Sequence, residues 1–193
     1  MRALNRYSAQ QKICSGGGRN MLEIGMICAE AGEKIARVSA NMAMAADMEV
    51  RASSTATTGA YSSACQRGLP AILMERGGGG RFTDSEVQAY KRDVKNIMIR
   101  MGLLSGEEVH TVQQKNVTRA EYLEAETDGL WYPVFSAGDT FAGGAVLGTV
   151  RDIWGNLLRE YRADYPGIVL YQTVGLGVKT GDPLIAYGEY VDR

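Results

Sequence analysis

Histidine and cysteine are scarce in this sequence of 193 residues. The single histidine, His110, lies in a polar segment beside Glu107 and Glu108, and we interpret it as solvated rather than as a metal ligand. An odd number of cysteines, widely spaced and without a CxxC pair, argues against a disulfide framework and a zinc ribbon; they are Cys14, Cys28 and Cys65. This pattern fits the reducing cytoplasm, where we expect the protein.

The sequence also lacks an excess of charge and a long apolar run. Lys and Arg total 21 against 22 for Asp and Glu, so the net charge of -1 gives no electrostatic footprint for nucleic acid or an anionic membrane. No apolar run approaches the roughly 18 residues that span a bilayer. With 45% hydrophobic residues the chain is globular, and we expect a small molecule or a protein as its partner.

The first half alternates between helical and strand-like patterns. Apolar residues recur at three- and four-residue steps over 24–46, which predicts an amphipathic helix. Short strands are expected at 48–53 and 69–74, with a short helix over 60–67 between them. A capping box at Thr83 and Glu86 opens a further helix that Gly102 ends. This alternation favours an α/β sheet with parallel strands covered by helices.

After the polar segment 105–118 the sequence shows only strand-like patterns. Strand-like runs at 122–127, 130–135, 145–150, 168–174 and 184–190 are separated by glycine turns. The stretches 128–150 and 166–188 resemble each other, and such a duplicated hairpin is typical of a barrel-sandwich similar to a biotinyl or lipoyl carrier domain. The connecting segment 151–165 contains no lysine to carry a cofactor, so the similarity is one of fold.

The segment AILMERGGGGRF, residues 71–82, places Glu75 after an apolar run and before four glycines. The glycines lack the Gly-Lys-Ser/Thr and GxGxxG patterns of nucleotide loops, which disfavours phosphate binding. Because ligands bind beyond the carboxyl ends of strands in open α/β sheets, Glu75 is a candidate catalytic carboxylate. A solvated strand end is the alternative that the pattern leaves open.

Two longer stretches resemble a known family. STATTGAYSSACQRGLPAILMERGGGGRF with the following helix, and GLWYPVFSAGDTFAGGAVLGTVRDIWG with GIVLYQTVGLGVKTGDPLIAYG, resemble the succinylglutamate desuccinylase/aspartoacylase family of zinc-dependent deacylases. The resemblance implies part of a zinc-carboxypeptidase-like α/β domain followed by a small all-β barrel-sandwich lobe. It places the catalytic domain at 1–104, a linker at 105–118 and the lobe at 119–193.

The resemblance also implies a reaction and its residues. Zinc would lower the pKa of a bound water while Glu75, as general base and acid, moves a proton from that water to the leaving amine of a small N-acyl amino compound. Tyr61 lies near the implied pocket, and Arg76 or Arg81 could pair with a substrate carboxylate.

The implied zinc site is incomplete in this sequence. The family's HxxE pair would precede Met1, and ICSGGGRN, residues 13–20, resembles the family segment DLHGGDxN with Ser15 in place of the ligand histidine. Neutral serine is a poor zinc ligand, so we expect the chain alone to bind zinc weakly and to be inactive. A fragment of a longer enzyme, a diverged chain that has lost catalysis and one half of a split protein are all compatible with this sequence. So are an oligomer and a non-catalytic remnant that binds a partner.

Overall fold

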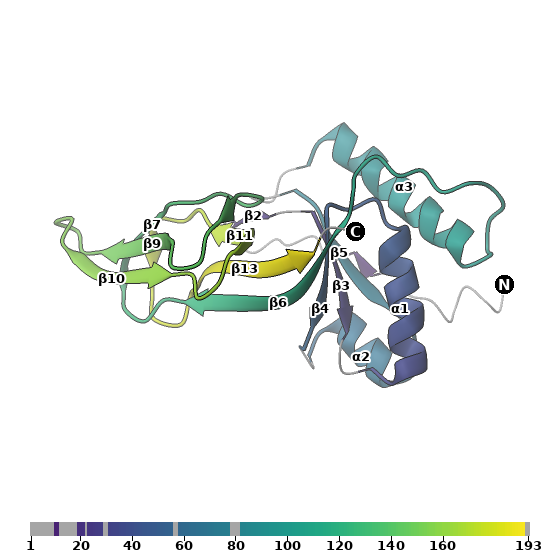
Figure 1. The fold of residues 1–193 in the computed structure, drawn as a ribbon, viewed down its shortest axis with the longest axis horizontal. Helices are drawn as coiled ribbons and strands as arrows, with labels where there is room; N and C mark the ends of the chain where they lie inside the picture. The colour runs from purple at the N-terminus through teal and green to yellow at the C-terminus, as the bar shows by residue number, and fades with distance from the viewer. Residues whose placement is uncertain are drawn as a thin grey trace.

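The computed structural model describes residues 10–11, 19–21, 23–28, 31–55, 58–77 and 82–191. Figure 1 shows an elongated molecule in which the three helices gather at one end and an all-β lobe extends from them to the other. The predicted fold class, an α/β sheet domain followed by a small β lobe, is confirmed. No helix among these residues is both long and apolar enough to cross a membrane.

One sheet of nine strands runs through both parts of the molecule. Its order is β1-β5-β3-β4-β6-β13-β11-β2, and β8 also pairs with β11. The strands are β1 (Gln10–Gln11), β2 (Arg19–Met21), β3 (Ile24–Cys28), β4 (Val50–Ser54), β5 (Ile72–Glu75), β6 (Lys115–Glu124), β8 (Thr140–Phe141), β11 (Gly167–Thr173) and β13 (Pro183–Val191). The long strand β6 joins the helical end to the lobe, because it pairs with β4 and with β13.

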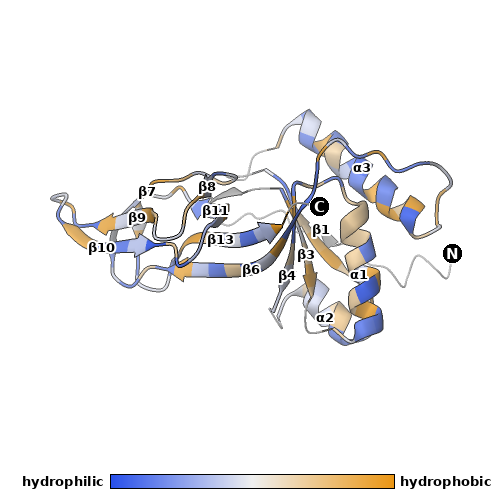
Figure 2. Ribbon diagram, viewed as in Figure 1, coloured by the Kyte–Doolittle hydropathy of each residue, from blue (hydrophilic) through white to orange (hydrophobic). Residues whose placement is uncertain are grey.

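Three helices follow from the local sequence: α1 (Glu33–Ala45), α2 (Ala60–Gln66) and α3 (Asp84–Arg100). The predicted capping box is present, since the Thr83 hydroxyl accepts from the Glu86 N–H and the Glu86 carboxylate accepts from the Thr83 N–H. Both α1 and α3 carry hydrophilic and hydrophobic bands, as Figure 2 shows. Their apolar sides cover one face of the sheet through a cluster that includes Ile27, Met42, Ile72, Met74 and Ile97.

The helix predicted over 24–46 is wrong in its first part. Residues Ile24–Cys28 form the buried strand β3, and the helix begins only after Gly32. A run of five apolar residues fits helical and strand spacing equally well, so periodicity alone could not separate the two.

The prediction of parallel strands is only partly correct. Strands β3 and β4 are parallel, as are β4 and β6, but β5 runs antiparallel to β3 with Glu75 opposite Ile24 and Leu73 opposite Met26. The direction of a strand depends on where its connection crosses the sheet. The hydrophobic pattern of a buried strand is the same in either direction, so it does not predict which one the strand takes.

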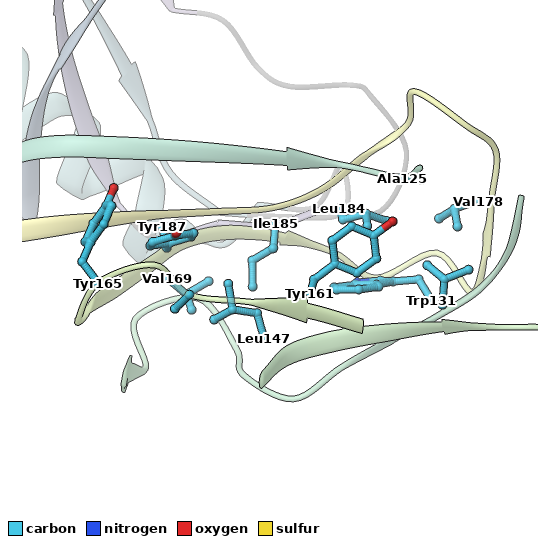
Figure 3. Packing of buried hydrophobic residues seen from close by; sticks show 12 residues of the cluster. Ala125, Trp131, Leu147, Tyr161, Tyr165, Val169, Val178, Leu184, Ile185 and Tyr187 are labelled. Carbon is cyan, nitrogen blue, oxygen red and sulfur yellow. The ribbon is translucent and has the colours of Figure 1, made fainter. Parts of the chain in front are cut away.

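The β lobe is a sandwich of two sheets. Its second sheet has the order β10-β9-β7-β12, formed by β7 (Gly129–Pro133), β9 (Val146–Arg151), β10 (Leu157–Arg162) and β12 (Gly177–Val178). Figure 3 shows the core between the sheets, where Trp131, Leu147, Tyr161 and Tyr187 pack together. The hydrophobic pattern gave no sign of β10, because Tyr161 is its only buried residue.

The segment 105–118, predicted as a linker, is hydrogen-bonded to Asp47, which follows α1 at the helical end of the molecule. The Asp47 carboxylate accepts hydrogen bonds from the backbone N–H groups of Thr111 and Val112 at 2.7 and 3.1 Å. It also accepts from the Thr111 hydroxyl and from Nε of Arg92, at 2.7 and 2.8 Å. Burial alone would raise the pKa of Asp47, but these hydrogen bonds outweigh burial and hold the pKa below its usual value.

Candidate active site

A pocket of about 1000 Å³ opens on the face of the nine-stranded sheet opposite α1 and α3. Its floor comes from β3, β4, β5 and β6, and α2 with its preceding loop forms one wall. Hydroxyl side chains dominate its polar lining, contributed by Ser53, Ser54, Thr55, Thr58, Tyr61, Thr118, Tyr122 and Tyr171.

Glu75 lies at the end of β5 with its side chain on the pocket face. Alternation along the strand turns Leu73 and Glu75 toward the pocket, while Ile72 and Met74 pack under the helices. The residue is 8% exposed, so its carboxylate is buried at the pocket floor rather than solvated at a strand end. The rule that ligands bind beyond the carboxyl ends of parallel strands does not explain why Glu75 lies in the pocket, because β5 runs antiparallel to β3. The alternation of side chains along β5 explains it.

Three tyrosines from separate elements surround the same space. Tyr61 comes from α2, Tyr122 from β6 and Tyr171 from β11. The rings of Tyr122 and Tyr171 are 6.3 Å apart between centroids and tilted by 44°. Burial raises the pKa of Tyr122, and the nearby Tyr61 and Glu75 raise it further, so this phenol stays neutral at physiological pH.

Sequence reasoning named Tyr61 but missed Tyr122 and Tyr171. Both lie on predicted strands, yet the pocket forms only because β6 and β11 come together through β13. That pairing brings together residues 49 positions apart in the chain (171 minus 122). No local signal in the sequence could have identified them.

Arg76 is held on the other side of the sheet. Its guanidinium pairs with Asp93 at 2.8 Å and with Glu23, and it donates to the Asp47 carbonyl at 2.6 Å. The side chain is 2% exposed. These partners use the donors that would have met a substrate carboxylate, so Arg76 anchors the end of β5 and is not one of the residues lining the pocket.

Arg119 is among the residues that line the pocket, but its guanidinium group points away from the pocket. A register shift in the pairing of β6 with β13 falls at Thr118. Beyond it, Ala120 and Tyr122 face the pocket and Arg119 faces away, with its guanidinium carbon 4.1 Å from the ring centroid of Tyr165. Its Nη2 also lies 3.3 Å from a carboxylate oxygen of Glu121.

The described residues do not fit a zinc ion. Within the described ranges, no group of three His, Cys, Asp or Glu side chains could hold a metal. His110 pairs with Glu108 at 3.0 Å on an exposed loop and is not among the residues lining the pocket. Ser15 and Arg81, both singled out from the sequence, lie outside the described residues.

Comparison with known proteins gives a consistent picture of the fold. No family model matches the sequence. A curated relative, the N-alpha-acetyl-L-2,4-diaminobutyric acid deacetylase of Halomonas elongata, is 28% identical over 127 residues, which cover 63% of this chain and 37% of that protein.

Solved structures match over nearly the whole chain. A succinylglutamate desuccinylase/aspartoacylase from Rhodobacter sphaeroides superposes with a TM-score of 0.78 at 21% identity, covering 97% of this chain and 59% of that one. The ectoine utilization protein EutE (DoeB) from Ruegeria pomeroyi gives a TM-score of 0.77 at 20% identity, covering 94% and 56%. This chain therefore spans little more than half of these proteins, and it shares the fold of the succinylglutamate desuccinylase/aspartoacylase structures.

Proposed function

We propose that this chain forms the base-bearing part of a deacylase that hydrolyses the amide bond of a small N-acyl amino compound. The observation that carries the proposal is the buried Glu75 carboxylate at the floor of a large pocket, on a fold shared with deacylases. The named substrate of the Halomonas relative, an acetylated amino acid, supports the same substrate class. The free thiols Cys28 and Cys65 support a cytoplasmic location.

In this proposal Glu75 acts on the water that attacks the acyl carbonyl. The carboxylate takes a proton from the water and returns it to the departing nitrogen, so the products are a carboxylate and an amine. Tyr61, Tyr122 and Tyr171 place hydroxyl and ring surfaces around the substrate. We route no step through zinc, because the described residues supply no ligand set.

A graft tests whether this chain can complete a deacylase. Residues 15–191 would replace the matching segment of the Halomonas deacetylase, once with Ser15 and once with Ser15→His. We expect the Ser15→His graft to bind zinc and hydrolyse N-acetyl amino acids. The Ser15 graft and the 193-residue chain alone should show neither stoichiometric zinc nor turnover.

Zinc content by metal analysis and amine release are measured on the same samples. Circular dichroism confirms that each graft is folded. A folded Ser15→His graft that holds zinc but releases no amine would contradict the proposal, and turnover by the unaltered chain would contradict the expected loss of the metal site.

A further inference from the structure

Strand β10 forms a free edge of the second sheet of the lobe. Among the described strands its partner is β9, and β10 has six residues where the opposite edge strand, β12, has two. Five of the six side chains of β10 are exposed. Figure 1 shows this strand in the part of the lobe that extends away from the helices. A free edge of this length presents a row of backbone donors and acceptors to which another strand can bind.

Apolar side chains are uncovered at the start of β10 and in the turn before it. Ile153 and Trp154 in the turn are 76% and 82% exposed, and Leu157 and Leu158 are about half exposed. Neighbouring large apolar side chains left in solvent are typical of an interaction surface. The strand edge and these side chains together indicate a partner that pairs with β10.

The backbone groups of β10 that face the free edge come from alternate residues. Just after the strand, the Ala163 N–H donates to the Ala145 carbonyl at 3.0 Å, and the Ala163 carbonyl accepts from the Gly144 N–H at 2.8 Å. Both backbone groups of Ala163 therefore point toward β9. Because this direction alternates along an antiparallel strand, the N–H and C=O groups of Glu160 and Arg162 point to the free edge.

The side chains of Glu160 and Arg162 lie on the outer face of the sheet, because Tyr161 between them packs into the core. Nε of Arg162 donates to Oε1 of Glu160 at 2.8 Å, and both side chains are exposed. Residues directly opposite each other in an antiparallel pair share a face of the sheet. Two copies of β10 related by a two-fold axis can therefore pair only with the axis at a residue, not between two residues.

The charges of β10 favour one of these registers. An axis at Arg159, Glu160 or Arg162 would place that charged residue opposite its own copy, which is unfavourable. An axis at Tyr161 places Glu160 opposite Arg162 of the second copy, and Arg162 opposite Glu160 of the second copy. The four side chains then alternate in sign around the axis. The strand is therefore complementary in charge to a second copy of itself.

We propose that β10 is a dimerisation strand, which pairs antiparallel with β10 of a second copy of this chain about a two-fold axis at Tyr161. The sheet β10-β9-β7-β12 then continues from one copy into the other. Because a six-residue strand gives a small interface, we expect a Kd of about 0.1 mM. Strand β10 lies outside the described lining of the pocket, so the proposal does not rest on the deacylase function.

Charge reversal tests the register. Glu160→Arg places four positive side chains around the axis and Arg162→Glu places four negative ones, so each variant alone should dimerise at least about tenfold more weakly than the wild type. An equimolar mixture of the two variants brings opposite charges together and should dimerise again. The double variant Glu160→Arg/Arg162→Glu restores the alternation and should dimerise within about threefold of the wild type.

Sedimentation equilibrium of the 193-residue chain, at concentrations up to about 1 mM, measures each Kd, and circular dichroism confirms that each variant is folded. Lys91→Glu, at an exposed position of α3, changes the net charge as much as Arg162→Glu does and should leave dimerisation unchanged.

The inference is overturned if the wild type stays monomeric up to about 1 mM, or if the two reversals leave the Kd unchanged. It is also overturned if neither the mixture nor the double variant recovers the dimer. In that case Glu160 and Arg162 would act only within their own strand, through the ion pair that they form there.

Discussion

At the scale of single residues, the buried ion pair between Arg76 and Asp93 fixes the end of the strand that carries Glu75. The two side chains are 2% and 0% exposed, and Asp93 also accepts from the Asp47 N–H at 2.8 Å. Asp93→Ala would leave the Arg76 cation buried with one partner fewer. We expect a loss of about 3–5 kcal/mol in the free energy of unfolding, measured by urea denaturation.

An exposed pair provides the control for this prediction. Arg162 and Glu160 lie 2.8 Å apart on the surface of β10, and Glu160→Ala should cost less than about 1 kcal/mol. Equal losses for Asp93→Ala and Glu160→Ala would show that the network around Arg76 does not hold the structure together.

The local sequence predicts part of the candidate site, but it does not predict contacts between residues that are distant in the chain. Glu75 can be named from the local sequence, because the strand before it is visible in the hydrophobic pattern, whereas Tyr61 is named only through the family resemblance. The residue type of Arg76 suits a substrate carboxylate, which is why the sequence makes it a candidate for substrate binding. Its burial by Glu23 and Asp93 depends on packing between distant segments, which the sequence pattern does not encode.

At the scale of elements, the lobe depends on a close contact between β9 and β7. A Cβ added at Gly148 would overlap the indole of Trp131, which is 2% exposed in the core. We expect Gly148→Ala to lower the free energy of unfolding by about 1–3 kcal/mol through overpacking, seen as a lower thermal midpoint.

Gly177 on β12 is the matched glycine for that comparison. A Cβ there would meet no atom within 4 Å, so Gly177→Ala should be close to neutral. If Gly148→Ala were as harmless as Gly177→Ala, the contact with Trp131 would not limit the packing of the two sheets.

The elements themselves were largely predictable, and the errors have physical causes. The capping box of α3 and the turns of the lobe are local signals, so those elements were found. The spacing of the apolar residues in β3 fits a helix as well as a strand, so the sequence predicts helix there. The sequence predicts no strand at β10, because both of its faces are exposed apart from Tyr161.

At the scale of the whole molecule, Asp47 ties the segment before β6 to the helical end, and it makes stability depend on pH. Its pKa is lowered in the folded state, so its carboxylate contributes stability that is complete above the unfolded pKa of about 3.9 and is lost as the pH falls through the folded value. We expect the wild type to exceed Asp47→Asn in stability near neutral pH.

That difference should shrink as the pH falls below about 4, because the unfolded wild type then takes up a proton at Asp47 while the folded protein still holds the carboxylate ionised. Below the lowered folded pKa both chains carry a neutral side chain at position 47. Urea denaturation at a series of pH values measures it. A difference that stays constant down to acidic pH would show that the ionised form of Asp47 does not contribute through its hydrogen bonds to Thr111 and Val112.

The central claim is that Glu75 moves the proton in amide hydrolysis, and Glu75→Gln in the Ser15→His graft tests it most directly. The glutamine keeps the size of the side chain and removes the base. We predict a fall in kcat of at least about 100-fold in the hydrolysis of an N-acetyl amino acid, with KM changed by less than about threefold. A Glu75→Gln graft that retains kcat within about threefold of the parent would contradict the claim.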